Sequence, residues 1–341
     1  MRITDEKVSV IVPAYNAHDT LARCLGSLVN QTLQDIEIIV VNDASTDDTW
    51  EIMSRCEKQF PDKVIIINSD RNRGAGGARN MALDMASGEY IGLVDSDDYV
   101  APNMYELLYS KAKDGDYDIV DSGFYQEATD TARLYTGDEL TGILNDEKRK
   151  RLIAGGGYLV TKVFKRELWQ KPVIRMRENV KCLADMDILI YMFLRASSID
   201  NVKEILYKYC DLSDSATKTM DVDAYFDSVY GAMQAIYDSC HRMSTYAGAI
   251  AAVEYAILSI YSFGINRCIY DQIHKYGAST EKIKIYFDEV GIKEETLLHK
   301  LTLLKNKIVS NGYDMNPFVV AKIKELDIEI MKECDKRFGR G

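Results

Sequence analysis

The chain has 341 residues, of which 47% are hydrophobic and 28% are charged. This is the composition of a globular protein with ample core-forming side chains, and the length allows a catalytic domain plus a second module. The formal net charge of -11 argues against a nucleic-acid-binding surface, which would need a basic face.

Seven cysteines are scattered along the chain, and no two of them form a C-x-x-C pair. An odd number without such pairs predicts reduced thiols, not a disulfide framework or a zinc site. The first residues contain no apolar stretch of the kind found in secretory signals. We therefore expect a cytoplasmic protein, either free or at the inner face of the membrane.

Short apolar, β-branched runs alternate with helical patterns over the first hundred residues. The runs predicted as strands are 8–13, 36–42, 64–68 and 90–95. Three helices are predicted between them. The first contains Leu21–Val29, the second begins at a capping box that starts with Ser45, and the third covers 76–87. This alternation predicts an α/β fold with a doubly wound, mostly parallel sheet flanked by helices.

Beyond residue 100 the alternation is less regular. We predict a helix over 102–113 and a strand over 117–122, followed by a polar stretch, 123–160, in which three consecutive glycines predict a mobile loop. The stretches 160–169 and 184–196 are interpreted as further elements of the same domain.

From about residue 220 the pattern is helical and carries no strand signal. We predict a first domain over 1–218 and an all-α module over 219–341, which could contact an acceptor, a second copy of the chain or a membrane surface. Within it, 247–265 is almost wholly apolar and approaches the length of a membrane span. The charge of Glu254 at its centre favours a buried helix or a dimer face, while peripheral contact with a membrane stays open.

Three aspartates follow the fourth predicted strand, in the sequence Asp95-Ser96-Asp97-Asp98. Open α/β sheets bind their ligands at the carboxyl ends of their strands. Unpaired acids beside each other are costly, so we expect a cation among them. A hard divalent ion fits best, and Mg2+ typically enlists one or two carboxylates plus substrate phosphates. A capping role for the next helix would need only one acid.

Polar and aromatic residues also follow the first two strands. Pro13 lacks an N–H and is expected to end the sheet pairing of the first strand. Tyr15, between Ala14 and Asn16, either lies against a nucleobase or packs beneath the next helix. Asp43, after the second strand, either accepts hydrogen bonds from a base or caps the following helix.

A glycine-containing loop, 72–80, follows the third strand. It is not a dinucleotide fingerprint, because Arg79 occupies the place of the third glycine and the loop does not follow the first strand. The glycines are expected to permit a tight turn before the helix. Arg79 is then available for a phosphate or for an internal carboxylate.

Taken together and in this order, these segments resemble family 2 glycosyltransferases of the GT-A fold, strongly over about residues 7–115 and more weakly to about 200. The resemblance implies that Pro13, Ala14, Tyr15, Asn16, Asp43, Arg79, Asp95 and Ser96 bind a nucleotide sugar. It implies that Asp97, with Asp95, holds Mg2+ or Mn2+, and that Asp185 is the catalytic base. Asp187 is the reserve candidate for the base.

The activity implied by the resemblance is transfer, with inversion, of a sugar from a UDP-sugar to a hydroxyl of a glycan or lipid-linked glycan, as in polysaccharide synthesis. Two alternatives stay open at this point. One is a nucleotidyltransferase, although the first loop carries no glycine or lysine. The other is a degenerate binding or scaffold subunit, which Asn42 and Ala184 favour because many family members carry acids at these places.

Overall fold

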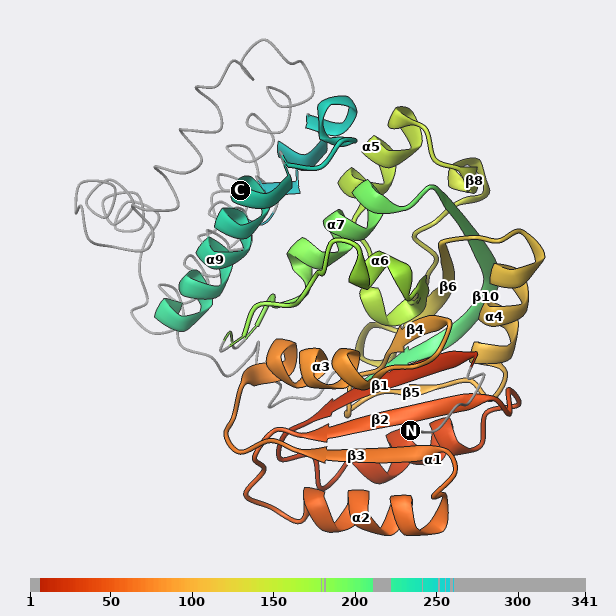
Figure 1. Ribbon diagram of the computed structural model, residues 1–341, viewed down its shortest axis with the longest axis vertical. Helices are drawn as coiled ribbons and strands as arrows, with labels where there is room; N and C mark the ends of the chain where they lie inside the picture. The colour runs from red at the N-terminus through yellow and green to blue at the C-terminus, as the bar shows by residue number, and fades with distance from the viewer. Residues whose placement is uncertain are drawn as a thin grey trace, which may run out of the picture.

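The computed structural model describes residues 7–178, 180, 182–210, 222–240, 242–250, 252–254, 256–257 and 260. Within them the chain forms one mixed sheet of ten strands flanked by helices, so the predicted α/β class is confirmed (Figure 1). The strand order is β3-β2-β1-β4-β9-β6-β10-β5, with β7 paired to β6 and β8 paired to β10.

The strands are β1 Val8–Ala14, β2 Ile36–Asn42, β3 Val64–Asn68, β4 Tyr90–Leu93, β5 Tyr99–Val100, β6 Ile119–Gln126, β7 Thr131–Arg133, β8 Gly142–Ile143, β9 Lys162–Lys165 and β10 Ser198–Tyr209. The α-helices are α1 Leu21–Val29, α2 Thr49–Gln59, α3 Gly74–Met85, α4 Met104–Asp114, α5 Asp146–Gly155, α6 Glu167–Gln170, α7 Met186–Arg195 and α9 Val222–Cys240. Short 3-10 turns occur at Glu127–Thr129, Asp138–Leu140 and Leu159–Thr161.

The first half of the sheet, β3-β2-β1-β4, is all parallel. Every residue of β1 and β2 is buried, as expected for strands covered on both faces. Figure 1 shows α1 and α2 on one face and α3 on the other. Glu37 is tolerated inside β2 because its Oε1 accepts hydrogen bonds from Ser87 and from the backbone N–H of Gly88 at 3.1 Å.

Predicted boundaries of β4, α2 and α3 are wrong by two to four residues, and α3 covers Gly74–Met85 where 76–87 was predicted. β4 ends at Leu93 because the chain turns at once, with the Asp98 N–H bonded to the Asp95 carbonyl at 3.1 Å. The capping box at Ser45 does not open α2, which begins at Thr49. The Ser45 N–H instead closes a turn onto Asn42 Oδ1 at 3.1 Å.

The second half of the sheet, β9-β6-β10-β5, is mixed. β9 lies antiparallel between β4 and β6, whereas β10 runs parallel to β6. Lys162 of β9 is buried against Asp121 of β6, with Nζ to Oδ1 at 2.9 Å, and three hydroxyl or backbone donors from Thr136 and Thr161 complete the coordination of that carboxylate. A buried charge pair without such partners would be strongly destabilising.

The polar stretch 123–160, predicted as irregular, contains β7, β8 and α5. The glycines at 155–157 do not form an independent loop. Gly155 is the last residue of α5, and Gly156 follows it with a φ of 70° and a ψ of -139°, a conformation that glycine adopts because it has no Cβ.

The described part of the predicted carboxyl-terminal module packs on the sheet domain. The Tyr191 hydroxyl of α7 donates to the Ala235 carbonyl of α9 at 2.8 Å. In the apolar segment 247–265, which is described only in part, Glu254 is buried and accepts from the Tyr246 hydroxyl at 3.2 Å. None of the helices in the described residues combines the length and apolarity needed to cross a membrane. The rest of the module lies outside the described residues, and the domain division stays a prediction.

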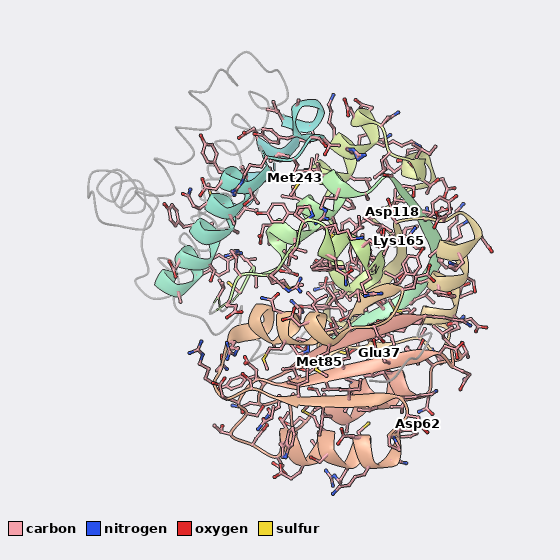
Figure 2. All side chains as sticks on the ribbon, viewed as in Figure 1. Glu37, Asp62, Met85, Asp118, Lys165 and Met243 are labelled. Carbon is pink, nitrogen blue, oxygen red and sulfur yellow. The ribbon has the colours of Figure 1, made fainter. Side chains whose placement is uncertain are left out.

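We use "carboxyl edge" for the edge at which β1, β2, β4, β6 and β10 end and at which the antiparallel β9 begins. The opposite edge is marked by Glu37, Asp118 and Lys165, which Figure 2 labels. All of the residues predicted to carry chemistry after strands β1, β2 and β4 therefore meet at the carboxyl edge.

Candidate active site at the carboxyl edge

The acidic turn after β4 brings three carboxylates together. Asp95, Asp97 and Asp98 each offer an oxygen within 4.8 Å of the others. They do not have the same surroundings. Asp98 is fully buried and faces β10, accepting from the Tyr207 hydroxyl at 2.5 Å and from the Cys210 N–H at 2.7 Å. Asp95 and Asp97 are only partly buried, which leaves them as the two acids open to a ligand.

Electrostatic repulsion within the turn is strong. Burial, followed by the charge of Asp95, raises the pKa of Asp97 to about 6. Burial and the charges of Asp95 and Asp97 raise the pKa of Asp98 to about 8. A cation among these oxygens would relieve the repulsion, and an all-oxygen set of this kind suits Mg2+ or Mn2+. The residues thus fit the predicted metal.

Two residues that the sequence did not single out, Arg23 and Tyr207, hold this turn. Arg23 of α1 donates from Nη2 to the Asp97 carbonyl at 2.8 Å and lies over the ring of Tyr99. Tyr207 of β10 accepts from the Asp95 N–H at 3.3 Å while it donates to Asp98. They come from segments far from the turn in sequence, so spacing along the chain carried no signal for them.

Arg79 pairs with a carboxylate, the second of its two predicted uses. Its Nη2 donates to Asp95 Oδ1, and the residue is 5% exposed. Its Nε makes no hydrogen bond within the described residues. Burial acts to lower the pKa of Arg79, but the charges of Asp95 and Asp185 raise it. Arg79 therefore lies within electrostatic range of both the acidic turn and the predicted base.

Asn80, next along α3, holds the backbone of the segment that leads to the predicted base. We call the described residues of 176–185 the strap. Asn80 Nδ2 donates to the Met176 carbonyl at 2.9 Å, and the Met176 N–H donates to Asn80 Oδ1 at 2.8 Å. α3 thus fixes Asp95 through one residue and the strap through the next.

The glycines before and within α3 make room for the strap. Gly74 has a φ of 74°, as expected for a turn before the helix, and a Cβ there would meet the Val180 carbonyl at 2.9 Å. A Cβ on Gly76 would lie 2.2 Å from the Arg177 carbonyl. The turn was predicted from the sequence; the close contact with a segment one hundred residues away was not.

The two candidate bases differ in what they already bind. Asp187 is 2% exposed and pairs with Arg177, whose Nε lies 3.3 Å from Oδ1. Burial raises the pKa of Asp187, and the charge of Arg177 acts against that rise. Asp185 precedes α7, is partly exposed and makes no capping hydrogen bond. The geometry therefore favours Asp185 for contact with a substrate and Asp187 for holding the strap.

The loop after β1 is arranged differently from the prediction in one respect. Pro13 does not end the pairing, since it lies opposite Val41 in the register with β2. The Ile11 carbonyl accepts a hydrogen bond from the Val94 N–H, so the backbone groups of Ile11 point toward β4. The backbone groups of Pro13, two residues later in the strand, point to the same side, where β4 has already ended. Its missing N–H therefore breaks no ladder bond.

Beyond β1, Tyr15 is 50% exposed, so it does not pack beneath the helix as the alternative reading required. Asn16 has a φ of 47°, which asparagine tolerates better than most residues. Its Oδ1 accepts from the Thr46 N–H at 2.8 Å and so joins the loop after β1 to the loop after β2.

Asp43 caps a helix, but not the one that follows it in the sequence. Its Oδ1 accepts from the backbone N–H of Arg73 at 2.8 Å, at the start of α3, and the residue is 2% exposed. Burial raises the pKa of Asp43, and the N–H groups of Arg73 and Gly74 act against that rise. Asn42 uses both ends of its amide, donating to Asn68 at 2.7 Å and accepting from Ser45, which a carboxylate could not do.

The family of the chain follows from its likeness to known sequences. A sequence model described as glycosyl transferase family 2 matches residues 9–169. The uncharacterized glycosyltransferase EpsJ of Bacillus subtilis (strain 168) is 32% identical over 244 residues, which cover 68% of this chain and 70% of EpsJ. WfaP of Escherichia coli, a UDP-Glc:alpha-D-GlcNAc-diphosphoundecaprenol beta-1,3-glucosyltransferase, is 46% identical over 94 residues, covering 28% of this chain and 36% of WfaP.

Solved structures show the same fold. The complex of S. aureus TarS 1-349 with UDP-GlcNAc matches with a TM-score of 0.67 at 18% identity, covering 98% of this chain and 92% of the TarS 1-349 chain. The mannosyltransferase PcManGT of Pyrobaculum calidifontis, in complex with GDP-Man and Mn2+, matches with a TM-score of 0.53 at 15% identity, covering 90% and 86%. The chain belongs to glycosyltransferase family 2 and is a glycosyltransferase of the GT-A fold.

Proposed function

We propose that the chain transfers a hexose or N-acetylhexosamine, with inversion, from a UDP-sugar to a hydroxyl of a cell-surface glycan or lipid-linked glycan. One observation carries the proposal. Asp95 and Asp97, which fit a divalent ion, lie at the carboxyl edge, and Tyr15 lies on the β1 side of them. Arg79, which pairs with Asp95, is also within electrostatic range of Asp185.

The nucleoside is assigned to the ends of β1 and β2. Tyr15 is exposed there and offers a flat aromatic face to the uracil ring. Pro13 and Ala14 are the last residues of β1, and Asn16 and Asp43 belong to the loops that follow β1 and β2. Asp43 already accepts one hydrogen bond from the start of α3, so its part in base recognition rests on its remaining acceptor capacity.

The diphosphate is assigned to the turn after β4. Asp97 and Asp95 are the residues that would hold Mg2+ or Mn2+, and the ion, when bound, supplies positive charge against the leaving diphosphate. Ser96 lies between them in the turn. Arg79 keeps Asp95 in place through their ion pair and adds a second positive charge near the same oxygens.

Asp185 is assigned as the general base. During attack its carboxylate takes the proton of the acceptor hydroxyl, whose oxygen bonds to the anomeric carbon while the bond from that carbon to the diphosphate breaks. Such proton transfer contributes about 10²–10⁴-fold to a rate. The base acts from the face opposite the leaving group, and no covalent enzyme intermediate is required.

The acceptor class is the least specific part of the proposal. It draws on the names of relatives, since WfaP acts on a diphosphoundecaprenol-linked sugar and the TarS complex contains UDP-GlcNAc. An acceptor of that kind would place the protein at the inner face of the membrane. The cytoplasmic location and any self-association stay predictions.

Thermal stabilisation by nucleotide sugars tests the donor. UDP-glucose, UDP-galactose, UDP-GlcNAc and GDP-mannose are compared with and without Mn2+, and UDP release is then measured for the sugar that stabilises most. We expect stabilisation by UDP-sugars that increases with Mn2+. Stabilisation by GDP-mannose alone, or release of pyrophosphate from a nucleoside triphosphate, would contradict the proposal.

A further inference from the structure

A cluster of three aromatic rings lies at the carboxyl edge of the second half of the sheet. β9 runs antiparallel to β4, with Val163 opposite Gly92, so the residues that precede β9 lie beside the end of β4 and its acidic turn. Tyr158 belongs to this preceding stretch. Phe124 lies near the end of β6, the next strand across, where the following turn and β7 bring Tyr135 back beside it.

The three rings hold one another in fixed orientations. The rings of Tyr135 and Phe124 are parallel, with centroids 5.8 Å apart and planes 1° from each other. The ring of Tyr158 is nearly perpendicular to both, with its centroid at 5.0 Å and its plane at 82° to Phe124, and at 5.6 Å and 83° to Tyr135. Phe124 is buried whereas Tyr158 is 46% exposed. The cluster therefore presents one rigid, half-exposed ring.

We propose that Tyr158, supported by Phe124 and Tyr135, is a stacking platform for a pyranose ring of the acceptor. This inference rests on the proposed function and adds a subsite for its second substrate. The apolar face of a pyranose carries C–H bonds with partial positive charge, and the face of an aromatic ring is the negative end of its quadrupole. A platform that is already ordered loses little rotamer entropy when the sugar binds.

The position of the platform assigns it to the acceptor and not to the nucleoside. Across the carboxyl edge the order is β2 and β1, with Asp43 and Tyr15, then β4, with the acidic turn, then β9 and β6, with the platform. A donor whose base lies at β1 and whose diphosphate lies at β4 would place its sugar toward β9. The incoming hydroxyl must approach from beyond that sugar, which is the platform side.

The charge of the candidate base, Asp185, acts on the Tyr158 hydroxyl. Burial, Tyr135 and, at longer range, the charge of Asp185 raise the pKa of Tyr158 to about 12, so its hydroxyl keeps its proton at neutral pH. Arg133 acts in the opposite direction on the same hydroxyl. The Tyr158 hydroxyl is hydrogen-bonded to Tyr135 and keeps acceptor capacity, so it can accept a hydrogen bond from a sugar hydroxyl while its ring face stacks on the sugar.

The test compares two half-exposed tyrosines on either side of the acidic turn. Saturation-transfer NMR measures binding of methyl β-D-glucopyranoside, methyl β-D-galactopyranoside and methyl N-acetyl-β-D-glucosaminide in the presence of UDP and Mg2+, and calorimetry measures binding of UDP. The variants are Tyr158→Ala, Tyr158→Phe and Tyr15→Ala. Melting temperatures confirm that each variant is folded.

We expect Tyr158→Ala to weaken binding of at least one saccharide about tenfold, with UDP binding unchanged, and Tyr158→Phe to retain most of it. Tyr15→Ala should do the reverse. Equal saccharide binding by wild type and Tyr158→Ala, or no saccharide signal in wild type, would overturn the platform and leave the donor proposal standing. Saccharide binding that depends on Tyr158 in a protein that does not bind UDP would overturn the donor proposal and keep the platform.

Discussion

The two halves of the sheet differ in how they bring polar side chains to the carboxyl edge. In the first half, β1, β2 and β4 are buried, mostly apolar strands, and the polar residues assigned to the site follow them closely in sequence. In the second half the strands are mixed in direction, and β9 carries the buried Lys162 that pairs with Asp121 of β6. Residues that act together there are separated by dozens of positions in the chain.

This difference separates two tasks. The first half holds the residues assigned to the nucleotide and the metal, and the second half, with α7, holds Asp185 and the aromatic platform. α3 joins them, because Arg79 binds Asp95 and Asn80 binds the strap. Variants in the first half should therefore change nucleotide or metal binding, whereas variants in the second half should change transfer at unchanged affinity for UDP.

The largest effect is expected for Asp97→Ala. Loss of the principal carboxylate of the turn should lower metal-dependent release of UDP from the donor by about 10³-fold or more, since it removes the charge stabilisation of the leaving group. The matched control is Asp62→Ala, an exposed acid remote from the turn, which should retain wild-type turnover. Wild-type activity of Asp97→Ala would break the assignment of the metal to the first half.

Asp185→Asn should lower transfer about 10²–10⁴-fold, because the amide cannot accept the proton of the acceptor hydroxyl. UDP binding, measured by calorimetry, should be unchanged. Asp187→Ala serves as the comparison: breaking its buried pair with Arg177 should lower the free energy of unfolding by about 3 kcal/mol. A variant of Asp185 that keeps full transfer would show that the base lies elsewhere.

Asn80→Ala tests whether α3 couples the halves. Both hydrogen bonds to Met176 are lost, so the strap should hold Asp185 less accurately and kcat should fall about 10–100-fold. The KM for the donor and the Kd for UDP should change little. Asn30→Ala, which removes an exposed asparagine of the loop after α1, is the control. A fall in UDP affinity equal to the fall in kcat would count against this positioning role.

Tyr15→Ala should weaken UDP binding about tenfold, and Tyr15→Phe should leave it nearly unchanged, because stacking needs the ring and not the hydroxyl. Calorimetry with UDP and Mg2+ measures both. The same dissociation constant for Tyr15→Ala and wild type would refute stacking on this residue.

The smallest effect concerns pH. Because the pKa of Asp97 in the metal-free fold is raised to about 6 from 3.8, the folded state holds more protons than the unfolded state between these values. Stability without metal should therefore fall as pH rises through that window. Added Mg2+ displaces the proton, so the stabilisation of the fold by Mg2+ should grow as pH rises from 5 to 7. Each kcal/mol of added stability corresponds to a rise of about 2–4 °C in Tm. Asp97→Asn should reduce this pH dependence, and the part that remains belongs to Asp98, whose pKa is raised to about 8.

By itself the sequence determined the alternation of strands and helices in the first half, and it located the polar residues after β1, β2 and β4. Both follow from local rules, since a strand buried on both faces is an apolar run and parallel strands end at one edge. The sequence also indicated the acidic turn as a cation site, because neighbouring unpaired carboxylates repel one another and a bound cation relieves that repulsion.

Only the tertiary structure decided which partners those residues have. Asp43 caps α3, Gly76 is small because the strap passes over it, and Tyr207 and Arg23 hold the acidic turn. The two acids of the Asp185 segment become distinct only when Arg177 is seen to bind one of them. These contacts join segments that lie far apart in the sequence, in some cases by about a hundred residues. Hydrophobic periodicity reports only which face of an element is buried, so it contains no information about such partners.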